Sequence, residues 1–243
     1  MAAIAAWLVI WILVAHFVDK ELLLPYPWTV LKTLGKLCLA FTFWKAVAYS
    51  LLRILIGIVI GLVCGTLVAV LTSKSEIAYK FLYPMITVIR ATPVASFIIL
   101  AWLLLGAGTL PAFITFLMVF PIAWSAVSDG IKALDPNLAD ACKSYRFSFG
   151  KRLRVFYIPS ILPYFLSACK TAIGMGWKAG VAAEVLAVTP ISIGMHLYNA
   201  KLYLETPDLF AWTTVTILLS LLFERLASAL IDRSQKRRRN VKN

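Results

Sequence analysis

Long apolar runs alternate with short polar segments along most of the chain. Several of these runs approach or exceed the roughly 20 residues that are needed to cross a hydrocarbon core. The pattern therefore predicts an all-α integral membrane protein with about six transmembrane helices. The expected spans cover residues 2–18, 47–71, 81–105, 110–128, 160–188 and 209–231.

The same pattern predicts a single transmembrane domain, residues 1–231, followed by a basic, disordered tail, residues 232–243. Between the first two spans, residues 22–45 show a shorter amphipathic pattern. Pro25 and Pro27 break its start, and apolar side chains then recur at helical spacing beside two lysines. Such a pattern favours a helix that lies at the outer membrane interface.

Proline and glycine positions add detail to the spans. Pro93 cannot donate a hydrogen bond to the carbonyl of Ile89, so a kink is expected in the third span. Small residues that recur every four positions let another helix backbone approach closely. This spacing predicts helix packing at two sets of glycines: Gly57, Gly61 and Gly65 in the second span, and Gly176 and Gly180 in the fifth.

The composition supports the membrane class. Hydrophobic residues make up 61% of the chain and charged residues 14%, with a mean hydropathy of +0.87, whereas soluble domains carry about 25% charged residues. With the N-terminus inside, fourteen lysines and arginines fall in inner segments and five in outer segments. This asymmetry follows the positive-inside rule and explains most of the net charge of +13. Both termini are therefore expected in the cytoplasm.

The basic tail has two interpretations. The run from Lys236 to Arg239 is suited to the anionic lipid of the cytoplasmic leaflet, which we favour over binding of nucleic acid. The four cysteines contain no CxxC pair, and the two histidines stand alone. Neither a metal site nor a disulfide framework is therefore predicted.

Residues 135–159 form the most polar segment between two apolar runs. Asp135 is a natural N-cap, and Pro136 suits the first helical position. One face of the expected helix then carries apolar or small side chains: Leu138, Ala141, Cys142 and Tyr145. The helix is expected to end near residues 146–148. Its stripe suits either the groove of a partner protein or the membrane surface.

This segment resembles the EAA loop of ABC importer permeases, which reads Glu-Ala-Ala, three residues, Gly, nine residues and Ile-x-Leu-Pro. Asp140-Ala141-Cys142 occupies the Glu-Ala-Ala place, Arg146 the Gly place, and a segment ending at Pro159 the last place. The differences are Asp for Glu, Cys for Ala and Arg for Gly. Further segments resemble the permeases for nitrate, sulfonates, taurine, bicarbonate and thiamine precursors: Leu24 to Pro27, Arg90 to Pro93, and Trp177 with Val181 to Glu184.

The resemblance implies a type I importer fold in the bacterial inner membrane. Two permease copies, expected as a homodimer, would join two ATP-binding subunits and an external substrate-binding protein. The helix within residues 135–159 would be the coupling helix that docks into the ATPase. ATP and Mg²⁺ would bind to that partner, since this chain has no GxxxxGK[ST] motif. The chain itself is expected to be no enzyme and to hold no cofactor.

Ionisable residues within spans are costly and usually face a cavity or a partner. The candidates for the translocation pathway are Arg90, Lys178 and Glu184, together with Trp102 and Trp177. Lys178 and Glu184 lie about 120° apart around a helix, so each needs a partner elsewhere. A cationic face would suit an anionic solute such as a sulfonate. A structural role, in which these residues bind or pack against neighbouring helices, remains open for each.

A self-sufficient secondary transporter is the alternative function. It would use Lys178 and Glu184 as a proton or ion relay, and such transporters are typically built from internal repeats. No repeat is evident in the sequence. A membrane enzyme would need a cluster of nucleophile, base or metal ligands, which two lone histidines do not supply.

Overall fold

The computed structural model describes residues 2–18, 20 and 22–240, with side chains for all of these except residues 2–4, 143, 230 and 232–240. Every regular element within that part of the chain is helical. The elements are α1 Ala2–Val18, α2 Pro27–Leu39, α3 Phe41–Thr72, α4 Glu76–Ala91, α5 Val94–Leu104, α6 Leu110–Lys132, α7 Pro136–Ser144, α8 Phe149–Arg152, a π-helical turn Leu153–Tyr157, α9 Ile158–Leu186, α10 Ile193–Leu202 and α11 Thr206–Asn240.

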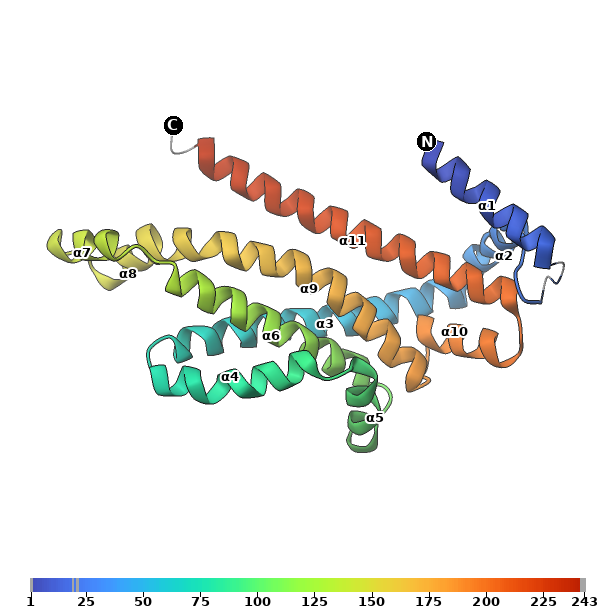
Figure 1. Cartoon of the computed structure of the whole chain (residues 1–243), viewed down its shortest axis with the longest axis horizontal. Coiled ribbons are helices and arrows are strands. Elements are labelled where there is room, and N and C mark those ends of the chain that lie inside the picture. The colour runs from blue at the N-terminus through green and yellow to red at the C-terminus, as the bar shows by residue number, and fades with distance from the viewer. Residues whose placement is uncertain (1, 19, 21, 241–243) are drawn as a thin grey trace.

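The helices form an elongated bundle with different structures at its two ends (Figure 1). Helices α3, α6 and α9 run side by side through the centre, where α6 packs against both of the others. At one end α7 and α8 project beyond the bundle, and at the other end α2 and α10 lie beside α11. The predicted amphipathic helix after Pro25 is present as α2, with Pro27 in its first turn.

The structure confirms only part of the predicted set of spans. Within the described residues, three helices are long and apolar enough to cross a membrane: α3, α6 and the part of α11 from Thr206 to Ala229. Helices α4 and α5 would add a fourth if they were counted together. The apolar part of α1 is shorter, covering Ala5–Val18. The structure therefore supports an all-helical membrane protein but not the expected count of six spans.

The single kinked helix expected over residues 81–105 is wrong. Helices α4 and α5 are separate and meet at an angle of 103°. Thr92, which precedes a proline, is extended with ψ 133°, and Pro93 has ψ 132°. A proline disfavours the helical conformation in the residue before it. Because two consecutive residues are extended, the chain changes direction rather than bending within one helix.

The glycines on α3 and α9 lie at the contacts between the central helices. A Cβ atom on Gly57 would lie 2.4 Å from the carbonyl oxygen of Ala112 on α6. On α9, a Cβ atom on Gly180 would lie 2.5 Å from Ile54 Cγ1 of α3. Gly61, Gly65 and Gly176 are just as crowded, with the nearest atoms at 2.7–2.9 Å. The backbones of α3, α6 and α9 therefore approach one another as closely as glycine permits.

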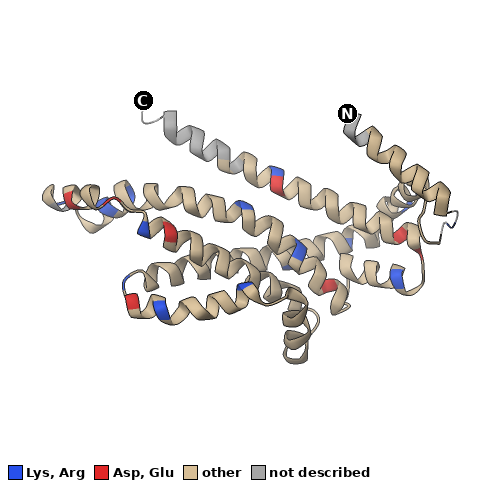
Figure 2. Ribbon diagram, in the orientation of Figure 1, with Lys and Arg blue, Asp and Glu red and all other residues tan. Residues whose placement is uncertain are grey.

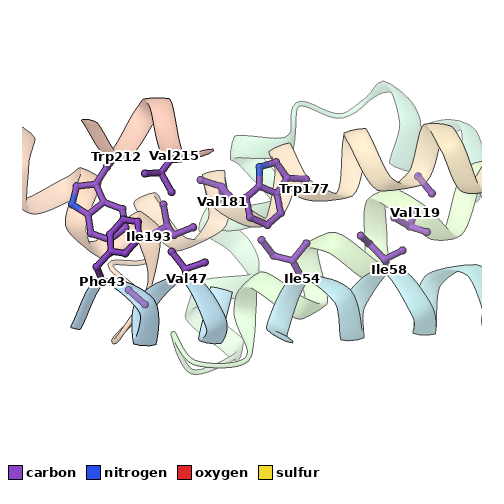
Figure 3. Close-up of a cluster of buried hydrophobic side chains, with 12 residues drawn as sticks. Phe43, Val47, Ile54, Ile58, Val119, Trp177, Val181, Ile193, Trp212 and Val215 are labelled. Carbon is purple, nitrogen blue, oxygen red and sulfur yellow. The ribbon is translucent and has the colours of Figure 1, made fainter. Parts of the chain in front are cut away.

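A layer of buried apolar side chains continues this contact toward α11. Figure 3 shows Phe43 and Val47 of α3, Val181 of α9, and Trp212 and Val215 of α11 directed toward one another. The Phe43 and Trp212 rings have centroids 5.0 Å apart. On its other side, the ring of Trp212 stacks on His196 of α10 at 4.5 Å. His196 thus packs against Trp212. Burial lowers the pKa of His196, and the carboxylate of Asp208 opposes that shift.

The beginning of the basic tail is not disordered. Helix α11 continues without a break to Asn240, which contradicts the expectation for residues 232–240. Lysine, arginine and glutamine are good helix formers, and no proline or glycine interrupts them. The lipid contact predicted for the tail depends on side chains outside the described part, and residues 241–243 also lie outside it.

Candidate functional site

Helix α7 begins as its sequence predicts. The backbone N–H of Asn137 donates to Asp135 Oδ1 at 2.8 Å, and the N–H of Ala139 donates to the backbone carbonyl of Asp135 at 3.1 Å. Pro136 occupies the first helical position, where its missing N–H is not needed. Asp135 therefore caps a helix that would otherwise expose unpaired amide groups at the tip of the molecule.

The apolar stripe of α7, meaning Leu138, Ala141, Cys142 and Tyr145, is left largely uncovered by the rest of the chain. Leu138 is 54% exposed and Tyr145 77% exposed. Ala141 is also exposed, and Cys142 is half-buried. Asp140 lies on the exposed surface as well. An exposed leucine and an exposed tyrosine two turns apart on a polar tip form a surface that another molecule can bury.

The end of α7 explains one difference from the EAA pattern. Arg146 has a φ of 49°, in the left-handed region that glycine adopts at no steric cost. The N–H of Phe147 donates to the carbonyl of Cys142 at 3.1 Å, which is the long bond of a Schellman cap. The Gly place of the pattern is therefore the left-handed position after the helix. Arginine there costs about 1 kcal/mol.

Beyond Arg146 the chain returns to the bundle through a short basic turn. Lys151 Nζ lies 4.1 Å from the centroid of the Phe147 ring, a cation–π contact. Helix α8 and the π-helical turn then lead directly into α9, where Pro159 is in the first turn. The segment predicted from Asp135 to Pro159 is thus a helix, a left-handed cap and a return into α9.

Glu184 is completely buried in the bundle. One of its oxygens, Oε2, accepts hydrogen bonds from Ser50 Oγ at 2.8 Å and from the N–H of Gly194 at 3.2 Å. Ser50 Oγ in turn accepts from the N–H of Ile193 at 2.9 Å. The carboxylate and the hydroxyl thereby satisfy the first amide groups of α10, where negative charge is favoured. Glu184 joins α3, α9 and α10.

The loop between α9 and α10 is strained and tightly held. Val188 and Ile191 both have φ 49°, which is unusual for β-branched residues. The guanidinium of Arg53 donates to the carbonyls of Pro190 and Ile191 at 3.1 and 3.2 Å. A Cβ atom on Gly194 would lie 2.3 Å from Glu184 Cβ. Sequence reasoning missed Ser50, Arg53 and Gly194, whose only signal was a polar residue or a glycine beside an apolar run.

A first charged cavity lies between α9 and α11. It has a volume of about 520 Å³ and is lined by Trp177 and Lys178 of α9 and by Ser220 and Glu224 of α11. Trp177 is buried, and its indole N–H donates to the carbonyl of Thr216 at 3.1 Å. A Cβ atom on Gly174 would meet Glu224 Oε1 at 2.6 Å. The Glu224 carboxylate therefore reaches across to α9, one helical turn from Lys178.

A second charged cavity lies between α4, α6 and α9, where Thr171 and Met175 share the face of α9 that carries Lys178 one to two turns further on. Its volume is about 500 Å³, and its polar lining consists of Arg90, Ser125, Asp129 and Thr171. Arg90 donates to Ser125 Oγ at 3.1 Å. Arg90 is the last residue but one of α4, next to the break before α5. Figure 2 shows that charged residues are sparse along the central helices.

Within one copy of the chain, the five predicted pathway residues do not all line the same cavity. Arg90 lines the second cavity, Trp177 and Lys178 line the first, and Glu184 is buried beside α10. Trp102 is 47% exposed on α5 and lines neither cavity. Linear sequence had grouped residues that the tertiary structure separates.

Comparison with known proteins agrees with this architecture. Residues 57–240 match the family described as "Binding-protein-dependent transport system inner membrane component". The chain is 28% identical over 232 residues to the taurine transport system permease protein of Escherichia coli (strain K12). The aligned residues cover 92% of this chain and 84% of that relative. It is 23% identical over 190 residues to a putative aliphatic sulfonates transport permease protein of Bacillus subtilis (strain 168), covering 77% and 68%.

A solved structure shares the fold. The crystal structure described as an amino acid ABC transporter with histidines matches with a TM-score of 0.62 at 19% identity, and covers 81% of this chain and 93% of that one. At this identity the likeness concerns the fold alone. The family match, in contrast, covers most of the chain. This protein belongs to the family of binding-protein-dependent transport system inner membrane components, the permeases of ABC importers.

Proposed function

We propose that the chain forms the translocation pathway of an importer for a small anionic organic or inorganic solute and that α7 couples it to a separate ATPase. The single observation that carries the coupling role is the exposed stripe of α7, held on a capped helix at the tip of the bundle. A membrane subunit that buries its other apolar faces in lipid has no need of such a stripe on a polar projection. A groove in a soluble partner would cover it.

In this assembly the partner ATPase binds ATP and Mg²⁺, and an external binding protein delivers the solute. The tip that carries α7 faces the cytoplasm, in agreement with the basic segments around it. Two copies of the chain enclose the pathway. The anionic class of the solute is supported by the sulfonate permease among the relatives, by the sulfonate group that taurine carries beside its ammonium group, and by Arg90 in the cavity between α4, α6 and α9.

The secondary-transporter alternative receives less support. A relay through Lys178 and Glu184 needs the two groups to face a common cavity. Lys178 lines the cavity between α9 and α11, whereas Glu184 is completely buried with Ser50 and Gly194. Glu184 has the contacts of a residue that holds helices together.

The coupling role is tested by charge substitutions on α7. We expect Leu138→Glu and Tyr145→Glu each to weaken co-purification with the partner ATPase by about tenfold or more, because a buried contact would have to accommodate an unpaired charge. Asn137→Glu, which places the same charge on an exposed residue outside the stripe, serves as the matched control and should bind normally. Unchanged binding of both stripe variants, with ATPase activity intact, would exclude docking through α7.

A further inference from the structure

We propose that the cavity between α4, α6 and α9 is the anion-binding part of the solute pathway and that Arg90 is the residue that selects the anion. This inference rests on the importer function proposed above and names the site within it. It also assigns different roles to the two charged cavities that flank α9. The cavity that contains Lys178 is then a contact region between α9 and α11.

The first argument is the break between α4 and α5. A helix that is interrupted at membrane depth leaves backbone groups without their helical partners, which is tolerated only where the chain is buried in protein or lines a cavity. Discontinuous helices are accordingly a pointer to solute sites in transporters. The break at Thr92 and Pro93 turns the chain by 103°, and Arg90 lies two residues before it, facing the cavity.

The second argument is the state of the Arg90 side chain. Arg90 is exposed in this chain and donates to Ser125 Oγ. Among the described residues it has no carboxylate within ion-pair distance. A guanidinium carries five N–H donors in a planar fork that fits carboxylate, sulfonate and similar oxyanions. One neutral hydroxyl leaves most of these donors available to a solute.

The cavity also contains a carboxylate, and its position matters. Asp129 is on α6, four residues after Ser125, and so lies one helical turn further along the same face. It is nearer to the end of α6 that leads to α7. Arg90, which bonds to Ser125, therefore lies about one helical turn further from α7 than Asp129 does. A solute anion is attracted to Arg90 and repelled by Asp129, so the two charges together set how tightly the cavity holds the anion.

The Lys178 cavity differs in one decisive respect. Its carboxylate, Glu224, reaches into the space that Gly174 leaves on α9, next to Lys178. The two opposite charges are thus supplied by adjacent helices that pack against each other. Glu224 thus lies at a packing contact between α9 and α11, which is the contact role that the proposal gives this cavity.

The test measures the charge selectivity of the cavity directly. Ala126 lines it and is half-buried, so Ala126→Cys introduces a small thiol at the wall. The assembled importer in nanodiscs is labelled with the anionic 2-sulfonatoethyl methanethiosulfonate or the cationic 2-(trimethylammonium)ethyl methanethiosulfonate. Peptide mass spectrometry gives the labelling rate of residue 126 with the anionic reagent and its labelling rate with the cationic reagent. The exposed Cys38 serves as the internal reference for both rates.

We expect Arg90→Gln to lower the ratio of anionic to cationic labelling by about tenfold, the lower range of focusing by a charged cleft. Arg90→Lys, which keeps the charge, should retain most of the ratio. Asp129→Asn should change it in the opposite direction, so the proposal remains testable even if one variant fails to fold. Lys178→Gln should leave the ratio as it is. An unchanged ratio in Arg90→Gln, or a larger change in Lys178→Gln, would overturn the proposal.

A transport measurement separates this inference from the importer function itself. With taurine and ethanesulfonate as probes, Arg90→Gln should reduce uptake while complex assembly and basal ATP hydrolysis persist. If no ATPase associates with the unmodified chain, the importer function fails, whatever the labelling shows. If the complex assembles and hydrolyses ATP but Arg90→Gln transports both probes normally, only the assignment of Arg90 fails.

Discussion

The centre of the bundle and its α7 tip use side chains in opposite ways. At the centre, Gly57 and Gly180 have no side chain, and α3, α6 and α9 fill the space that a Cβ atom would occupy. At the tip, Leu138 and Tyr145 have large side chains that the described residues leave mostly exposed. The comparison teaches that one region is closely packed within the chain, whereas the other keeps an apolar surface that the proposed partner would cover.

The largest effect is expected from adding one methyl group at the centre. Gly57→Ala would place a Cβ atom 2.4 Å from the backbone oxygen of Ala112, which only a shift of α3 or α6 can relieve. Overpacking of this kind costs about 1–3 kcal/mol. We expect the unfolding temperature in detergent to be clearly lower than that of the unmodified chain. Tryptophan fluorescence during heating measures it.

Gly35→Ala is the matched control. Gly35 lies inside α2, and no atom lies within 4 Å of the position of an added Cβ. Alanine there should stabilise the helix by about 0.5–1 kcal/mol. Opposite signs for the two substitutions would confirm the distinction between close packing and open surface, whereas equal effects would contradict it.

An intermediate effect is expected from Ser50→Ala. Its hydroxyl donates to Glu184 and accepts from the N–H of Ile193, so its removal leaves a buried carboxylate and a buried amide with fewer partners. The expected loss is about 1–3 kcal/mol of stability. Hydrogen exchange at the start of α10 should rise with it.

Ser73→Ala tests whether the loss is specific. Ser73 follows the same helix, but it is exposed and its hydroxyl donates only to the nearby carbonyl of Val70. This substitution should change stability by less than about 0.5 kcal/mol. If Ser50→Ala proved equally mild, Glu184 would not depend on Ser50 for its place in the bundle.

The smallest effect, and a favourable one, is expected at the tip. Arg146→Gly relieves the positive φ and should stabilise the end of α7 by about 1 kcal/mol. Amide exchange in α7 would then slow by about fivefold. Arg152 has φ −60°, so Arg152→Gly should have the reverse effect on the local helix. Faster exchange in Arg146→Gly would show that the left-handed position is not what favours glycine in the EAA pattern.

Much of the fold was predictable from local signals. The apolar runs predicted the long helices, and Pro27 predicted the start of α2. The start of α7 was predicted by Asp135 and Pro136. The pathway residues were less predictable, because a charge within an apolar run indicates only that a partner is needed. Ser50 is 134 residues from Glu184 in sequence, and no spacing along the chain connects the two.

Sequence by itself determined the class of the protein, the capped α7 helix with its stripe and the glycines that let helices approach, since these depend on neighbours within a turn or two of the chain. Only the tertiary structure decided the 103° turn after α4, the burial of Glu184 beside α10, and the placement of Arg90 and Lys178 in different cavities. The physical reason is that successive side chains point about 100° apart around a helix, so neighbours in sequence face different directions. Which direction meets a cavity and which meets another helix is set by packing between distant segments.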